Sequence, residues 1–284
     1  MEKRLILRGL LAGAVGGVLA FLFARIFAEP QIQRAIDYEE GRETAQSALD
    51  RAAGIVAEHA HADPFSRAVQ GNVGIGVAMI FFGMAMGALF AVAYAICLGR
   101  TGRVQARNLA VLVAGGGFLS MYLVPFLKYP ANPPAIGHED TIQQRSSFYL
   151  LMVACSVLFL ILTVWLGRRL QPRFGTWNAA LIAGGVFIAA AGIVMLLLPS
   201  FGELTANREY HQATETPAAL TDANGAIVFP GFPADLLFAF RLYSIGAQLV
   251  LWTAIGLVFA PLAERLLEPS SSRTGTVREA AMVS

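Results

Sequence analysis

Residues 73–98 read VGIGVAMIFFGMAMGALFAVAYAICL, and no charged side chain interrupts them. A helix needs about 20 apolar residues to cross the hydrocarbon core of a bilayer, which is roughly 30 Å thick. Because lipid offers the backbone no hydrogen-bond partners, a spanning segment must be a helix or part of a closed barrel. The run shows no alternation of polar and apolar residues, so it predicts a transmembrane helix rather than a barrel strand.

Five further runs have the same character, and each is long enough to cross a bilayer with some tilt. They are Leu5–Phe27, Leu109–Leu127, Phe148–Gly167, Ala179–Leu198 and Leu236–Leu262. The chain is 56% hydrophobic and only 14% charged, whereas soluble domains carry about 25% charged residues. The sequence therefore predicts an all-α integral membrane protein, a bundle of about six transmembrane helices.

The basic residues indicate how these helices are oriented. Six crossings place both ends of the chain on one side of the membrane, and the positive-inside rule assigns the side rich in Lys and Arg to the cytoplasm. The short segments on the terminal side carry most of the basic residues, whereas the opposite side carries most of the acidic residues and all four histidines. We therefore expect cytoplasmic N- and C-termini and acidic outer loops.

The domain organisation is predicted to be simple. Residues 1–268 are expected to form a single polytopic membrane domain, followed by a cytoplasmic tail, residues 269–284, whose Ser, Thr and Gly content is typical of disorder. The long outer loops are expected to be partly helical. In the first of them Ala45, Leu49 and Ala52 recur at helical spacing, which indicates an amphipathic helix.

Glycines recur every four residues on two of the predicted helices. Gly9, Gly13 and Gly17 lie on the first, and Gly83 and Gly87 lie on the second. Small residues at this spacing let helix backbones approach closely in a membrane. Tight packing within the chain is the main interpretation, and a contact face for a partner membrane helix is the alternative.

The first outer loop contains the strongest candidates for metal ligands. Glu58, His59, His61 and Asp63 lie within six residues of one another. Imidazole and carboxylate together suit borderline divalent metals such as cobalt, nickel and zinc. Two histidines two residues apart point the same way only on an extended chain, so joint chelation requires that the preceding helix has ended. The alternative is a pair of solvated loop histidines.

A second candidate is the stretch of sequence at the outer end of the third run, residues 123–134, which we call the lip. It reads LVPFLKYPANPP, and its candidate residues are Pro125, Lys128, Tyr129, Asn132, Pro133 and Pro134. The prolines impose a stiff, extended path and remove backbone donors, which leaves carbonyl oxygens in fixed positions. The alternative is a rigid exit from the helix, in which Lys128 and Tyr129 are anchored to lipid headgroups. His138 and Glu139, just beyond, could add metal ligands.

Arg241 lies inside the last predicted helix, where an unpaired charge is costly and normally finds an acid, a carbonyl or water. We expect it to order an outer acidic loop, and a role in gating cations is the alternative. No acidic residue or histidine lies deep in any run, and nucleotide-binding and hydrolase motifs are absent from the sequence. The sequence therefore predicts no enzyme, no nucleic-acid partner and no permanently bound cofactor.

Residues 126–134 with Gly137 and Arg145, together with Glu29–Pro30 and residues 232–242, resemble the CbtA family of predicted bacterial cobalt transporter subunits. The resemblance implies a multi-pass protein of the bacterial inner membrane that takes up Co²⁺. It also implies a small partner subunit, CbtB, with one membrane helix and a histidine-rich end.

We therefore expect a membrane subunit of a divalent metal uptake transporter. It would capture Co²⁺, the transported ion, on the outer face and pass it through the helix bundle, in contact with membrane lipid and a CbtB-like subunit, with a homo-oligomer as a further option. A membrane scaffold without transport activity is the alternative function. A membrane enzyme that uses an outer metal is a third hypothesis, which no set of deep acids, bases or nucleophiles supports.

Overall fold

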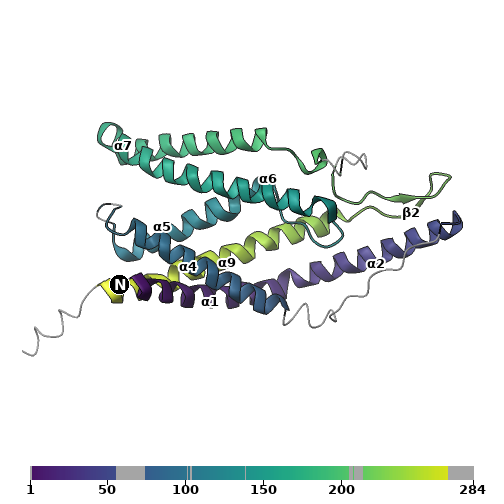
Figure 1. Cartoon of the computed structure of the whole chain (residues 1–284), viewed down its shortest axis with the longest axis horizontal. Coiled ribbons are helices and arrows are strands. Elements are labelled where there is room, and N and C mark those ends of the chain that lie inside the picture. The colour runs from purple at the N-terminus through teal and green to yellow at the C-terminus, as the bar shows by residue number, and fades with distance from the viewer. Residues whose placement is uncertain are drawn as a thin grey trace, which may run out of the picture. The chain divides into compact units, whose positions relative to one another are not determined.

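The structure is a computed structural model (Figure 1), and it describes residues 2–55, 74–100, 102, 104–137, 139–204, 207 and 214–267. Helices dominate this part of the chain. The main helices are α1 (Glu2–Phe27), α2 (Glu29–Ala52), α4 (Ile75–Cys97), α5 (Ala106–Gly117), α6 (Val124–Lys128), α7 (Ile142–Leu197) and α9 (Ala234–Leu267). The shorter elements are the π-helix η2 (Phe118–Leu123), the 3₁₀ turns η3 (Glu139–Thr141) and η4 (Phe201–Glu203), and the strands β1 (Leu220–Thr221) and β2 (Ile227–Phe229).

Five helices of the described chain are long and apolar enough to cross a membrane, and each of the six predicted runs lies wholly or largely within one of them. They are Glu2–Phe27, Ile75–Cys97, Ala106–Lys128, Ile142–Glu203 and Ala234–Leu267. The predicted all-α membrane bundle is confirmed. Which side the termini occupy stays a prediction.

The longest of these helices contains two of the predicted runs because α7 is broken at Gly175. This residue has φ 75° and ψ 168°, which no α-helix contains, and the chain reverses there (Figure 1). The two arms pack against each other. Met152 on the first arm is fully buried in one cluster with Phe187 and Ala191 of the second arm.

The third run forms one continuous helical segment with a π-helical turn in its middle. The π-helix η2 has a wider hydrogen-bond spacing, and the amide of Val124 donates to the carbonyl of Leu119 five residues back. Pro125 has no N–H, so it cannot donate to the next carbonyl in that register, which belongs to Ser120. The Ser156 hydroxyl of α7 donates to this carbonyl instead, which ties the irregular turn to its neighbour.

By their internal contacts the residues form two compact units. The first comprises residues 1–21, 75–116 and 249–284, and the second comprises residues 22–74 and 117–248. The single domain expected from the sequence stays a prediction, and the predicted tail lies outside the described residues.

Within the first unit, glycines bring α1 and α4 into backbone contact. A Cβ atom on Gly9 would overlap the carbonyl oxygen of Gly87, and one on Gly13 would overlap that of Gly83. A Cβ on Gly17 would lie 2.6 Å from the carbonyl oxygen of Met79. The interpretation of these glycines as tight packing within the chain is therefore confirmed.

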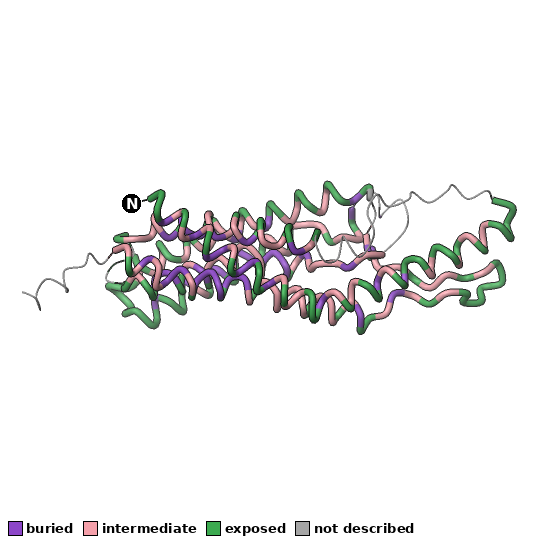
Figure 2. Tube along the Cα trace, turned by 90° about the horizontal axis from the view of Figure 1, so that it is seen from below, coloured by how far each residue is buried: buried purple, intermediate pink, exposed green. Residues whose placement is uncertain are grey.

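Within the second unit, α2 and the β1–β2 hairpin lie side by side. The Tyr38 hydroxyl donates to the carbonyl of Pro230 at 3.0 Å, and Arg42 donates to the carbonyl of Ala218 at 2.6 Å. Ala35 and Tyr38 are the buried residues of α2, and the rest of the helix is partly or fully exposed (Figure 2). The predicted helix in the first outer loop is confirmed, and it begins at Glu29, directly after α1.

Candidate functional site: a polar cavity beside the lip

The first part of the lip belongs to the third membrane helix, which ends at Lys128. The rest of the lip is extended chain. Tyr129 caps α6 with φ −126° and ψ 77°, and residues 130–133 belong to no helix or strand. Prolines at positions 130 and 133 cannot donate hydrogen bonds, so this segment presents carbonyl oxygens and must be held by donors from elsewhere.

Arg241 of α9 supplies these donors. Its Nε atom donates to the carbonyl oxygen of Ala131 at 3.3 Å, and its Nη2 atom donates to Oδ1 of Asn132 at 2.9 Å. Contrary to our expectation, these hydrogen bonds join Arg241 to the lip rather than to an acidic loop. The physical reason is that the proline-rich lip offers a carbonyl and an amide oxygen that a forked guanidinium can bind together.

Tyr129 lies inside the protein rather than among lipid headgroups. The residue is only 3% exposed, and its hydroxyl donates to the carbonyl of Pro199 at 2.8 Å. Its ring stacks on that of Phe201 with centroids 5.1 Å apart. The headgroup-anchor interpretation is therefore wrong for Tyr129, because the segment after α7, which contains Pro199 and Phe201, folds over this ring. Burial, and then the nearby Glu203, raise the pKa of the Tyr129 phenol.

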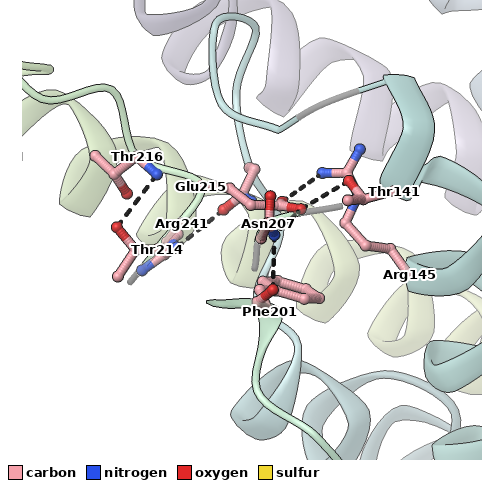
Figure 3. A network of polar contacts seen from close by, with 9 residues as sticks. Thr141, Arg145, Phe201, Asn207, Thr214, Glu215, Thr216 and Arg241 are labelled. Carbon is pink, nitrogen blue, oxygen red and sulfur yellow. Dashed lines mark hydrogen bonds and ion pairs between the residues drawn. The ribbon is translucent and has the colours of Figure 1, made fainter. Parts of the chain in front are cut away.

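Arg145, which follows the lip in the sequence, forms an ion pair with the buried Glu215 (Figure 3). Both residues belong to the same unit as the lip. Arg145 of α7 donates from Nη1 to Oε2 of Glu215 at 3.1 Å, and the Glu215 side chain is 1% exposed. Oε1 of Glu215 accepts hydrogen bonds from the Thr141 hydroxyl at 2.7 Å and from Nδ2 of Asn207 at 3.0 Å. Both oxygens of this carboxylate are therefore engaged.

The other side of the Arg145 guanidinium is pressed against Gly137. A Cβ atom on Gly137 would overlap the guanidinium, and the residue has φ 117°, a conformation that L side chains rarely adopt. A residue with a side chain would be strained in this conformation and would displace Arg145, so the position favours glycine. Arg145 Nε is buried and has no hydrogen-bond partner among the described residues.

A cavity of about 580 Å³ lies between the lip and the first arm of α7. Its polar lining includes Asn132, Arg145, Ser146 and the tyrosines Tyr122, Tyr129 and Tyr149. Apolar side chains such as Phe126, Ile142 and Leu150 complete the wall. The Tyr122 hydroxyl is buried and, within the described chain, has no hydrogen-bond partner. No pattern in the sequence indicated this cavity, although the lip that forms one of its walls was predicted as a candidate site.

The predicted metal ligands fall almost entirely outside the described residues. This applies to Glu58, His59, His61, Asp63 and His138, and for Glu139 only the backbone is described, in the turn η3. In the part of the chain that the structure describes, no group of three or more His, Cys, Asp or Glu side chains could hold a metal ion. The metal-ligand assignment stays a prediction.

The geometry at the lip predicts that Arg241 cannot be replaced by lysine without loss. A single ammonium cannot bind both the Ala131 carbonyl and the Asn132 amide, so Arg241→Lys should lower the free energy of unfolding by about 1 kcal/mol. Unfolding by SDS in detergent micelles measures this change. Arg51→Lys, on the exposed end of α2, is the control and should leave the free energy unchanged. Equal behaviour of the two variants would show that the lip contacts carry no stability.

Comparison with known protein families identifies a match that covers most of the chain. A family model described as "Probable cobalt transporter subunit (CbtA)" matches residues 2–264. No curated protein and no solved structure matches the chain. The matched region contains all five membrane-spanning candidates except the last three residues of α9, and it includes the lip, Arg145, Glu215 and Arg241. This multi-pass membrane protein therefore belongs to the CbtA family of probable cobalt transporter subunits.

Proposed function

We propose that the chain is the membrane subunit of a Co²⁺ uptake transporter, which captures the ion on its outer face and passes it through the helix bundle. The family match over residues 2–264 is the observation that carries this proposal. Co²⁺ is the transported substrate here and not a resident cofactor.

The proposed location is the bacterial inner membrane, with both termini in the cytoplasm. This orientation places the acidic helix α2 on the outer side, where its charge would raise the local concentration of cations. Glu39, Glu40 and Glu43 lie within two turns of α2. Burial, and then its neighbours Glu43 and Glu40, raise the pKa of the Glu39 carboxyl. A nearby divalent cation would relieve this repulsion.

The proposed capture ligands are Glu58, His59, His61 and Asp63, with His138 and Glu139 as further candidates. Neutral imidazole and carboxylate form a ligand set that Co²⁺ accepts. The lip residues Pro125, Lys128, Tyr129, Asn132, Pro133 and Pro134, held by Arg241, would border the outer end of the path. Their role would be to keep the entrance rigid.

A small CbtB-like subunit with one membrane helix is the proposed partner, and membrane lipid surrounds the bundle. A homo-oligomer is also compatible with a transporter subunit. The scaffold alternative receives less support, because the glycine faces of α1 and α4 are already packed against each other. These faces therefore cannot hold a partner helix.

The test is ⁵⁷Co²⁺ uptake into cells that lack other cobalt importers and that express the chain with and without a CbtB-like subunit. We expect chain-dependent uptake, and we expect His59→Ala/His61→Ala to reduce it about tenfold or more, as loss of metal-site residues commonly does. His211→Ala removes a histidine outside the proposed ligand set and is the matched control. Competition by Ni²⁺ or Zn²⁺ reports the selectivity.

Two outcomes would contradict the proposal in different ways. Absence of chain-dependent uptake even with the partner would favour the scaffold function. Full uptake by the double histidine variant would keep the transporter but refute the proposed capture ligands.

A further inference from the structure

Three basic and two acidic side chains of the described residues lie in or beside the lining of the cavity next to the lip. The acids are Glu215, which pairs with Arg145, and Glu203, which lies near Tyr129. Arg145 lines the cavity, Lys128 lies with its ammonium 5.8 Å from the ring centroid of Tyr129, which also lines it, and Arg241 is bonded to the lining residue Asn132. None of the described residues that line the cavity carries a carboxylate. Glu215, the acid nearest to Arg145, already binds Thr141, Asn207 and Arg145 with its two oxygens.

This charge arrangement decides what kind of ligand the cavity suits. Among the described lining residues a bare divalent cation would find no carboxylate or imidazole ligand, and the basic side chains around the cavity outnumber the acidic ones. A group that carries negative oxygen atoms would be attracted. The cavity therefore suits an oxyanion.

The polar lining supplies hydrogen-bond donors of the right type for such a group. Tyr149 and Ser146 contribute hydroxyls, and Arg145 contributes a guanidinium. The Tyr122 hydroxyl and Arg145 Nε are buried beside the cavity and lack partners among the described residues. A buried donor without a partner is destabilising, so a small side-chain movement that brought an acceptor oxygen to either group would form a favourable hydrogen bond.

The apolar edge of the cavity indicates where the oxyanion comes from. Ile142 and Leu150 line the cavity, and their side chains are 52% and 65% exposed. Both lie in the first turns of α7, a helix that is apolar enough to span the membrane. An exposed apolar edge of a membrane-spanning helix faces lipid. A phospholipid could therefore place its phosphate among the donors and continue its acyl chains along Ile142 and Leu150.

We propose that this cavity binds the phosphate group of an anionic phospholipid, held by Arg145 and the hydroxyls of Tyr122 and Tyr149. The volume of about 580 Å³ lies within the range of small-molecule sites. The proposal does not depend on cobalt uptake. It assigns the inner side of the lip to lipid and not to the passing cation.

The test is native mass spectrometry of the purified full chain with phosphatidylglycerol. Tyr122→Phe/Tyr149→Phe removes two hydroxyls and keeps both rings, so the fold should be preserved, as an unchanged gel-filtration profile would show. We expect an apparent Kd about a hundredfold weaker for this variant, because it loses two hydrogen bonds to a charged group. Tyr243→Phe removes a hydroxyl from α9 outside the cavity lining and is the matched control.

Further ligands separate the possible sources of the oxyanion. Phosphatidylcholine, which carries no net charge, should bind more weakly than phosphatidylglycerol. Glycerol 3-phosphate and inorganic phosphate should not compete at comparable concentrations, because they lack acyl chains. Equal phosphatidylglycerol binding by the double tyrosine variant and the wild type would overturn the proposal. Competition by free glycerol 3-phosphate at the affinity of the lipid would overturn its assignment to a membrane lipid.

Discussion

Replacement of Gly87 by alanine should lower the free energy of unfolding by about 1–3 kcal/mol, which is the usual cost of inserting a methyl group into a fully packed contact. The new Cβ would overlap the carbonyl oxygen of Gly9 and lie 2.8 Å from Cα of Gly13. Both obstacles are backbone atoms, so no side chain can rotate to make room. The helices α1 and α4 would have to move apart.

A second helical glycine provides a matched control for this variant. Gly185 lies in the second arm of α7, and a Cβ atom there would have no neighbour within 4 Å. Gly185→Ala should therefore leave stability unchanged or raise it by up to about 1 kcal/mol, because alanine is the better helix former. SDS titration in detergent micelles measures both variants. Equal stabilities of the Gly87 and Gly185 variants would show that the α1–α4 contact is not tight in the membrane protein.

The helical part of the fold could be predicted from the sequence because its signals are local. An apolar run of about 20 residues satisfies its own backbone hydrogen bonds and needs no distant partner to be helical. The glycine repeat on the first two runs likewise predicted close packing, since only a residue without a side chain permits backbone contact. The break in α7 lies between two runs, in the polar segment that contains Arg173 and Gly175.

The candidate site could be predicted only in part, because its contacts are distant in sequence. The prolines of the lip were visible, and the sequence showed that Arg241 needed a partner. Which partner it finds depends on packing across 109 residues, and the sequence allowed an acid, a carbonyl or water. The pairing of Arg145 with Glu215 spans 70 residues. The π-helical turn could not be predicted for a similar reason, since the hydroxyl of Ser156, on another helix, donates a hydrogen bond to the Ser120 carbonyl of this turn.

The structure and the metal hypothesis concern different parts of the chain. The proposed ligands His59 and His61 lie in a segment outside the described residues, while the described lining of the cavity contains Arg145 and no carboxylate. A single path for Co²⁺ through that cavity would be electrostatically unfavourable. The proposals of Co²⁺ uptake and of lipid binding are therefore compatible only if the ion enters outside the cavity. Measuring ⁵⁷Co²⁺ uptake by the Tyr122→Phe/Tyr149→Phe variant tests whether the two sites are separate.

Loss of the buried acid should have the second large effect. Glu215→Gln keeps the size of the side chain but leaves Arg145 without its counter-charge, and an uncompensated buried charge costs about 3–5 kcal/mol. Because the Arg145 side chain is 23% exposed, we expect a loss near the lower end, about 3 kcal/mol. The additional variant Arg145→Gln/Glu215→Gln should lose less than the sum of the two single variants, since it leaves neither charge unpaired.

An exposed ion pair provides the control for this effect. Arg107 and Glu264 lie 3.5 Å apart with side chains 58% and 38% exposed, so Arg107→Gln should cost less than about 1 kcal/mol. Similar losses for Glu215→Gln and Arg107→Gln would contradict the assignment of Glu215 as a buried structural charge.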